Sequence, residues 1–328
     1  MMSTRRFLIL VAFVLVIAAC NGVSTPQVMN DETVHVRLLM GYRPDVQFAP
    51  LYVAAERGYY EDAGIEIEFS HIPETEALQL VGANEVQFAI VSGEQTPLAR
   101  AQGLPVVYVM AWWQDYPVGI AASKDSGIGS PTDLVGKRVG IPGLYGASYV
   151  GYRALLSVTG VSDTDVSLDA IGYNQVEALY EGQEDAVVIY ANNEPLQLEA
   201  QGFPVNVMRV ADYVHLASNG LITNEETIQN HPDLIRRMVE ATLKGLQDTI
   251  EDPDMAYEMA KLYVEGLEQA NETVMRGVLN ASIDFWEAER LGYSDPASWE
   301  NMQRVLIEMG LLEEEIDLSQ AFTNEFLP

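Results

Sequence analysis

The stretch that decides the fold is GYRPDVQFAPLYVAAERGYYEDAGIEIEF, residues 41–69. The stretch before it is rich in apolar residues, as is typical of a buried strand: Val36, Leu38, Leu39 and Met40. Pro50 favours a helix over residues 50–57, because its missing N–H would be unpaired in the first turn anyway. The alternation of apolar residues with glutamates over residues 65–69 predicts a half-buried second strand. The loop after the first strand then lies where open α/β sheets bind ligands.

Strands and helices alternate from residue 34 to residue 123, which is the signature of βαβ units and a mostly parallel sheet. A second, similar array follows the Gly-, Ser- and Pro-rich stretch 125–132 and continues to residue 210. We therefore predict an α/β chain with two lobes and a hinge between them. The predicted boundaries place residues 34–122 and 218–328 in lobe one and residues 123–217 in lobe two, with chain crossings near Ser123 and Ala217.

After one short strand near Ile222, the remaining chain is predicted to be helical and to form a carboxyl-terminal appendage. A break is expected at His231-Pro232, since proline disfavours helix in the residue before it. The expected helices cover residues 225–251 with that break, 254–265, 271–289 and 296–309, with a short one near Glu313.

Residues 1–19 are typical of a lipoprotein signal peptide. Arg5 and Arg6 precede an apolar run, residues 7–16, that is too short to span a bilayer. Ile17-Ala18-Ala19-Cys20 resembles a bacterial lipobox, which predicts lipidation of Cys20, the only cysteine. An ordinary signal peptide or an uncleaved anchor is the alternative. Residues 20–33 are polar and aperiodic, as in a tether. We expect a protein held by lipid on the extracytoplasmic face of the cell membrane.

The chain is strongly acidic, with 18 Lys and Arg against 48 Asp and Glu and a net charge of −30. Removal of residues 1–19 deletes two arginines and no acid, so the mature charge is 16 − 48 = −32. Nucleic acid is excluded as an expected partner, because neutralising phosphates requires a basic surface. An anionic ligand would meet a repulsive field unless a local pocket overrides it.

Motifs of catalysis are absent from the sequence. The four histidines have no metal-ligand spacing, and neither GxSxG nor a P-loop occurs. The glycine-rich stretch 140–146 precedes a predicted helix and can hold an anion on backbone N–H groups, but it lacks the GxGxxG order. We therefore expect no catalytic residue, no metal site and no cofactor.

Aromatic and polar side chains gather at or just beyond predicted strand ends. Rings there can stack on flat heteroaromatic ligands and still offer a polar tip. The alternatives are that some rings are core, that Asp45 only caps a turn and that Asn193 only caps a helix. Strand alternation predicts that only one of two adjacent tryptophans faces the ligand. The candidate ligand-binding residues are Tyr42, Asp45, Gln47, Phe48, Ser92, Trp112, Trp113, Tyr145, Ser148, Tyr173, Tyr190, Asn193 and Glu194.

The stretch 41–69 resembles the first motif of solute-binding proteins of bacterial ABC importers, in the family that binds thiamine-pyrimidine precursors, sulfonates and riboflavin. The resemblance covers about residues 34–250. It implies a type II periplasmic-binding-protein fold whose lobes close on a small molecule. It also implies delivery to an ABC permease with its ATPase, without catalysis.

Pyrimidine binders and the related pyrimidine synthases of this group typically carry W-x-P-N-T-N-H in the first loop. Here Tyr42 replaces the tryptophan and Phe48 replaces the histidine, and the cysteine-rich motif of the synthases cannot exist. The loop GYRPDVQFAP, the Trp112-Trp113 pair and the stretches YNQVEAL and VVIYANNEP look most like riboflavin-binding lipoproteins of these importers. Riboflavin is the favoured ligand. A pyrimidine precursor or a sulfonate is the alternative, and a synthase-like enzyme is a remote one.

Overall fold

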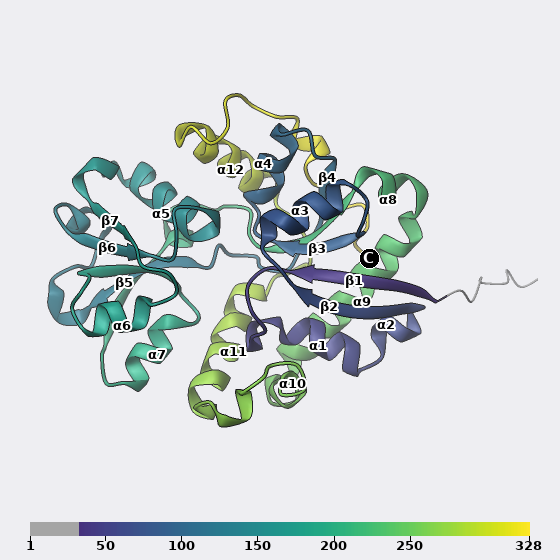
Figure 1. The fold of residues 1–328 in the computed structure, drawn as a ribbon, viewed down its shortest axis with the longest axis horizontal. Coiled ribbons are helices and arrows are strands. Elements are labelled where there is room, and N and C mark those ends of the chain that lie inside the picture. The colour runs from purple at the N-terminus through teal and green to yellow at the C-terminus, as the bar shows by residue number, and fades with distance from the viewer. Residues whose placement is uncertain (1–32) are drawn as a thin grey trace, which may run out of the picture. The chain divides into compact units, whose positions relative to one another are not determined.

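The computed structural model describes residues 33–328. The expected signal peptide, the lipidation site Cys20 and all but the last residue of the expected tether lie outside the described residues. Residues 33–328 form two five-stranded sheets with helices packed against both (Figure 1). This confirms the predicted two-lobed α/β fold, and each lobe is built around one of the two sheets.

The first sheet has the strand order β2-β1-β3-β10-β4. Strands β1, β2 and β3 pair in parallel, and β10 runs antiparallel between β3 and β4. The carboxyl ends of β1 to β4 therefore lie at one edge of the sheet. These strands are β1 Val34–Met40, β2 Ile65–His71, β3 Phe88–Val91, β4 Val106–Ala111 and β10 Gly220–Asn224.

The second sheet repeats this plan with the order β7-β6-β8-β5-β9. Its parallel strands β6, β7 and β8 also end at one edge, and β5 is the antiparallel strand beside β8. The strands are β5 Val118–Ser123, β6 Arg138–Ile141, β7 Ser167–Ala170, β8 Ala186–Tyr190 and β9 Val205–Arg209.

The predicted lobe boundary at residue 122 is wrong, because β5 belongs to the second sheet. It pairs with β8 and β9 along its length. The first crossing between the sheets therefore precedes Val118 instead of lying near Ser123. The return crossing lies in the connection between β9 and β10, and this connection contains Ala217, near which the crossing was expected.

Helices cover both faces of the first sheet. Leu38 and Met40 of β1 pack with α1 and α9, and Leu39 packs with α3 on the opposite face. This alternation is the period-2 pattern of a strand buried on both sides. The helices before the second crossing are α1 Ala49–Glu56, α2 Tyr59–Asp62, α3 Glu74–Gly82, α4 Gln95–Ala101, α5 Gly146–Thr159, α6 Gln175–Tyr180 and α7 Glu194–Ala200.

The carboxyl-terminal helices follow the prediction closely, with one exception. The break at His231-Pro232 separates α8 from α9 as expected, but the short helix near Glu313 does not form. Instead, a 3-10 turn covers Leu318–Gln320. The remaining helices are α8 Glu225–Asn230, α9 Pro232–Glu251, α10 Pro253–Ala260, α11 Glu272–Trp286 and α12 Pro296–Glu308.

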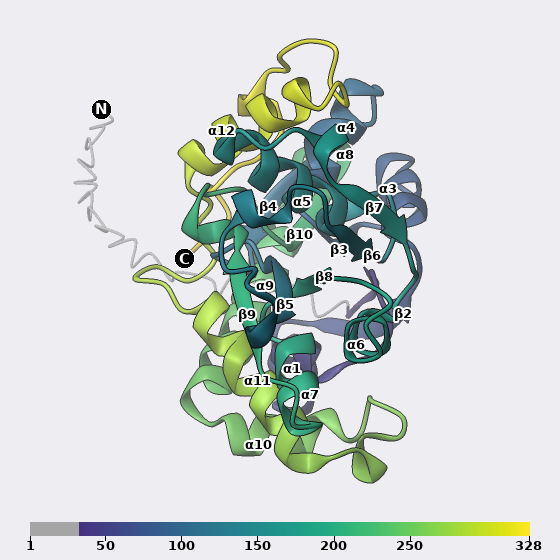
Figure 2. The ribbon, with the colours of Figure 1, turned by 90° about the vertical axis from the view of Figure 1, so that its left-hand side faces the viewer.

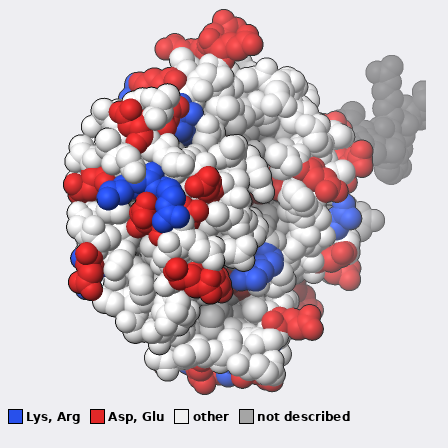
Figure 3. Space-filling view, turned by 60° about the vertical axis from the view of Figure 1, so that its left-hand side comes forward, with Lys and Arg blue, Asp and Glu red and all other residues white. Residues whose placement is uncertain are grey.

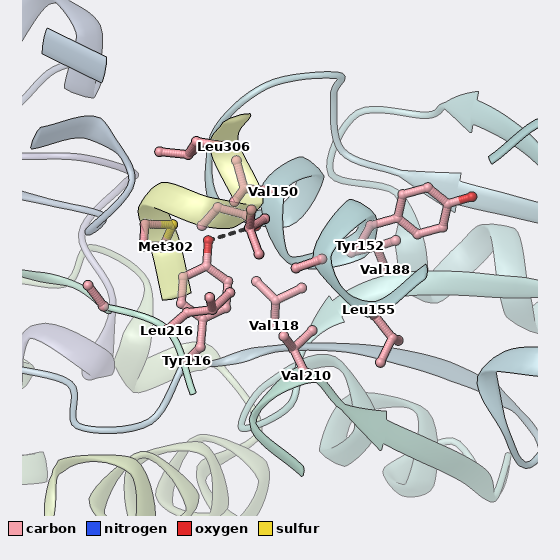
Figure 4. Close-up of a cluster of buried hydrophobic side chains, with 14 of the residues drawn as sticks. Tyr116, Val118, Val150, Tyr152, Leu155, Val188, Val210, Leu216, Met302 and Leu306 are labelled. Carbon is pink, nitrogen blue, oxygen red and sulfur yellow. Dashed lines mark hydrogen bonds between the residues drawn. The ribbon is translucent and has the colours of Figure 1, made fainter. Parts of the chain in front are cut away.

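These helices contact both lobes, so they are more than an appendage to the first. Helix α11 lies against α7, and α12 lies against α5 (Figure 2). Met302 and Leu306 of α12 lie beside Val150 of α5 (Figure 4). In the same cluster, the Tyr116 hydroxyl donates a hydrogen bond of 3.1 Å to the Ala147 carbonyl. A shared apolar core therefore joins the lobes on the α12 side.

No helix within residues 33–328 is both long enough and apolar enough to cross a membrane.

Candidate ligand-binding site

A cavity of about 570 Å³ lies where the carboxyl ends of strands from both sheets meet. This size is within the range of small-molecule sites, roughly 300–1,000 Å³. The first lobe contributes residues that follow β1, β2, β3 and β4, and the second lobe contributes residues that follow β6, β7 and β8. The strand-end rule for open α/β sheets thus applies to both lobes at once.

Every candidate ligand-binding residue except Asp45 lines this cavity. Asp45 instead caps the 3-10 turn Val46–Phe48, where its Oδ1 accepts hydrogen bonds of 3.1 Å from the backbone N–H and from Nε2 of Gln47. Burial raises the pKa of the Asp45 carboxyl. The structure thus shows the capping contact that the sequence offered as the alternative for Asp45. Asp45 orients Gln47, and Gln47 reaches the cavity.

Gln47 also links the two lobes. Its Oε1 accepts a hydrogen bond of 2.8 Å from Nδ2 of Asn192, which lies between β8 and α7. The same Nδ2 donates to Oγ of Ser282 on α11, again at 2.8 Å. Asn192 is fully buried. Gln47, which lines the cavity, is therefore held by a hydrogen-bonded chain that runs through both lobes.

Tyr42 adopts a left-handed backbone conformation, with φ of 64°. This conformation is uncommon for a residue other than glycine and is maintained only by surrounding structure. Nδ1 of His71, at the end of β2, donates a 3.0 Å hydrogen bond to the Tyr42 carbonyl. Burial lowers the pKa of His71. The Tyr42 ring meets the edge of the Tyr173 ring from the second lobe, with centroids 5.5 Å apart.

Trp112 and Trp113 do not divide into one inward and one outward side chain. Each is 2% exposed, and both line the cavity. The prediction fails because β4 ends at Ala111, and the N–H groups of both tryptophans then bond the same carbonyl, that of Asn219. Strand alternation no longer holds at these positions. Both rings also contact Trp286 of α11, which closes the wall behind them.

The aromatic lining comes from both lobes. Phe48 lies 5.3 Å from Trp112, and Trp113 meets Tyr190 of the second lobe at 6.2 Å between ring centroids. Tyr145 and Tyr173 lie at the cavity with 73% and 66% of their surface exposed. Buried rings therefore form the inner wall, and exposed tyrosines of the second lobe form the outer part. Such an arrangement suits a flat, largely apolar ligand.

The polar lining includes Glu74 and Glu194, and neither carboxyl group forms a salt bridge with another residue of the described range 33–328. Oε2 of Glu74 accepts hydrogen bonds from the N–H and the hydroxyl of Ser92, at 3.2 and 2.5 Å. Burial and the neighbouring Glu94 carboxylate raise the pKa of Glu74 to about 7. Burial likewise raises the pKa of Glu194 to about 7, although its Oε2 accepts the Tyr190 N–H at 2.9 Å.

Asn193 does not cap α7, in contrast to the alternative that the sequence left open. No capping bond from its side chain forms, and its Oδ1 accepts from Nε2 of Gln197 at 2.8 Å. Asn193 thus lines the cavity from the start of α7. Among residues 33–328, no group of three or more His, Cys, Asp or Glu side chains is placed to hold a metal ion.

The family model described as NMT1/THI5 like matches residues 45–256. The chain belongs to the NMT1/THI5-like family. A riboflavin-binding protein named RibY from Chloroflexus aurantiacus is 37% identical, and the alignment covers 100% of this chain and 99% of that protein. A 4-amino-5-hydroxymethyl-2-methylpyrimidine phosphate synthase of Legionella pneumophila is 27% identical over 89% of this chain and 92% of its own.

The solved structure of the periplasmic aliphatic sulphonate binding protein SsuA from Escherichia coli superposes with a TM-score of 0.73. The sequences are 14% identical, and the match covers 88% of this chain and 92% of that one. This likeness confirms the periplasmic-binding-protein fold. NMT1/THI5-like relatives carry names of both binders and synthases, so the ligand has to be argued from the cavity.

Several cavity-lining residues were not anticipated from the sequence. Most follow a strand end or begin the next helix, so applying the strand-end rule to every predicted strand would have found them. Glu74 is different, since an acidic residue at a helix start is common for reasons unrelated to ligands. The main unanticipated residues are Arg43, His71, Glu74, Gln95, Gln175 and Asn219.

Proposed function

We propose that this chain is the substrate-binding component of an ABC importer and that its ligand is riboflavin. The observation that carries the proposal is a cavity walled by aromatic rings from two lobes. The 37% identity to a riboflavin-binding protein over both full lengths supports it further. In the proposed mechanism the lobes close about a hinge on the flat ring system, and the closed form is recognised by the permease.

The chemistry of the lining supports a neutral ligand over a sulfonate. Glu74 and Glu194 face the cavity, and the basic side chains along it are Arg43 and His71. A sulfonate would approach both carboxyl groups, and above pH 7, where they are ionised, like charges at short range repel strongly where water is excluded. Riboflavin has no formal charge in its ring system or its ribityl chain. Its hydroxyl and imide groups can donate hydrogen bonds to carboxylates and amide oxygens.

A synthase-like activity is less well supported than binding. The ring nitrogen of His71, the histidine at the cavity, is engaged with the Tyr42 carbonyl. The single cysteine of the chain is Cys20, far in sequence from every cavity residue. We therefore propose binding without catalysis, with a thiamine-pyrimidine precursor as the second candidate ligand, because pyrimidine synthases are among the relatives.

Calorimetric titration tests the ligand. The full chain in detergent would be titrated with riboflavin, thiamine, the thiamine pyrimidine precursor and taurine. We expect riboflavin to bind with a dissociation constant of about 1 µM or lower, roughly −8 kcal/mol, and taurine not to bind. Absence of heat with riboflavin, together with binding of another of these compounds, would remove riboflavin as the ligand.

We also propose that Cys20 carries the lipid that anchors the protein to the membrane. The support is the sequence Ile17-Ala18-Ala19-Cys20 after a short apolar run. In cells, Cys20→Ala should move the protein from the membrane fraction to the soluble fraction. Ligand affinity should not change, because the cavity is built from residues 41–219. Full retention of the variant in the membrane fraction would contradict the lipid anchor.

A further inference from the structure

Glu74 occupies a position in the cavity that the ring-binding proposal does not explain. It begins α3, and its Cγ lies so close to Gly41 that a Cβ on that residue would be 2.6 Å away. The glycine after β1 therefore allows the Glu74 side chain to lie along the cavity wall. Ser92, the residue after β3, fixes the carboxylate with its N–H and its hydroxyl.

A second carboxylate lies behind the first. Glu94 is fully buried. Nε2 of Gln95 donates to its Oε1 at 3.3 Å, and its Oε2 lies 3.2 Å from the Tyr116 hydroxyl, whose one proton is shared with the Ala147 carbonyl. Neither Glu74 nor Glu94 takes part in any salt bridge among residues 33–328. The neutral donors around them cannot cancel the charge, as an arginine or lysine would. Burial raises the pKa of both carboxyls. Above about pH 7 Glu74 is ionised, and this end of the cavity is then electronegative.

Glu194 differs from Glu74 in its surroundings. Arg43 lies near enough to Glu194 to favour its ionised form, and it has no such effect on Glu74. Around Glu74 and Ser92 the cavity therefore presents a carboxyl group that has only neutral hydrogen-bond partners and forms no salt bridge within residues 33–328, which disfavours an anion there. This region is also rich in hydrogen-bonding groups, since Gln95 lines the cavity beside it.

We propose that Glu74, fixed by Ser92, binds the hydroxylated side chain of the flavin and rejects its phosphate ester. This inference rests on the proposed function and adds an orientation to it. The ring system lies among Phe48, Trp112 and Trp113, and the ribityl chain lies against Glu74. A carboxylate accepts hydrogen bonds from hydroxyl groups but repels a phosphate at the same place. The site therefore selects the free vitamin over flavin mononucleotide.

The test compares Glu74→Gln with Glu76→Gln in the full chain. Glu76 is exposed in the same first turn of α3 and does not line the cavity, so its substitution changes the net charge equally. Affinities would be measured above pH 7, where Glu74 is ionised, for riboflavin, flavin mononucleotide and lumichrome, the ring system without the ribityl chain. Glutamine keeps an oxygen that can accept from Ser92, so the variant should fold.

We expect wild type and Glu76→Gln to bind riboflavin at least about tenfold more tightly than flavin mononucleotide. In Glu74→Gln this ratio should fall at least about threefold, and lumichrome affinity should not change. An unchanged ratio in Glu74→Gln, or an equal loss of lumichrome and riboflavin binding, would overturn the inference while riboflavin binding stands. Failure of wild type to bind any flavin would instead refute the proposed function and, with it, this inference.

Discussion

The aromatic side chains of the cavity differ in what their removal should do. Trp112 is buried between Phe48 and Trp286, at 5.3 and 5.9 Å between ring centroids. Trp112→Ala should therefore lower the free energy of unfolding by roughly 3–5 kcal/mol, the usual cost of emptying a large core site.

Tyr173 is largely exposed, so Tyr173→Ala should change stability by no more than about 0.5 kcal/mol. It should still weaken riboflavin binding by roughly 1–3 kcal/mol through lost stacking.

Urea denaturation and calorimetric titration separate these effects. Tyr213→Ala is the matched control, because Tyr213 is also exposed but does not line the cavity. This variant should change neither the free energy of unfolding nor the affinity for riboflavin. Unchanged stability in Trp112→Ala would mean that the tryptophan cluster does not support the wall. Normal flavin affinity in Tyr173→Ala would remove Tyr173 from the site.

The same residues show how far sequence reasoning reaches. The positions of Gln47, Ser92 and Tyr190 in the cavity follow from one rule, that ligands meet the carboxyl ends of parallel strands. The orientation of the two tryptophans could not be predicted, because it depends on a carbonyl from Asn219, far along the chain. The role of Glu74 was equally hidden, since only the folded chain brings it against Gly41 and Ser92.

The positions of strands and helices along the chain were more predictable than the elements with which each of them pairs or packs. Gly160 ends α5 in a left-handed conformation, with φ of 72°, as a glycine after an apolar helix pattern suggests. The sequence predicts the strand β5 at its observed position but places it in the other lobe. Its sequence VGIAAS is apolar enough for the centre of either sheet, and its partners β8 and β9 come much later in the chain. Pairing between distant segments is not encoded in local periodicity.

Helices α11 and α12 illustrate the same limit. Their amphipathic pattern predicted helices, and each has a buried face and an exposed face. The pattern does not say that one helix packs against two lobes. Trp286 of α11 contacts both cavity tryptophans, while Phe285 lies under the Arg209 guanidinium from β9 of the second lobe, 4.6 Å from its ring centroid. These helices therefore couple the cavity wall to the contact between lobes.

Basic side chains among residues 33–328 repeatedly pair with acidic ones. On the face shown in Figure 3, acidic side chains are scattered and the basic ones lie beside acidic ones. Arg276 is an example, since it contacts Asp254, Glu258 and Glu272. Such exposed pairs add little stability, typically below about 1 kcal/mol each. The net charge of −30 instead favours solubility and disfavours anionic partners.

Closure of the lobes should depend on the buried hydrogen-bonded chain from Gln47 through Asn192 to Ser282. Asn192→Ala removes both 2.8 Å bonds and leaves the Gln47 Oε1 without its donor. An unsatisfied buried acceptor costs roughly 1–3 kcal/mol, and every 1.4 kcal/mol is about tenfold in an equilibrium constant. The variant without ligand should therefore favour an open arrangement, with a larger radius of gyration in small-angle scattering.

Saturating riboflavin should restore the compact form of Asn192→Ala, because ligand contacts to both lobes favour closure, but at higher ligand concentration than wild type requires. Asn206→Ala is the control, since Asn206 donates to the Ile128 carbonyl within the second lobe and loses a bond of similar kind. Its scattering should match wild type. If Asn192→Ala and wild type scatter identically with and without ligand, the chain through Asn192 does not govern closure, and the contacts of α11 and α12 with the second lobe are sufficient to hold it.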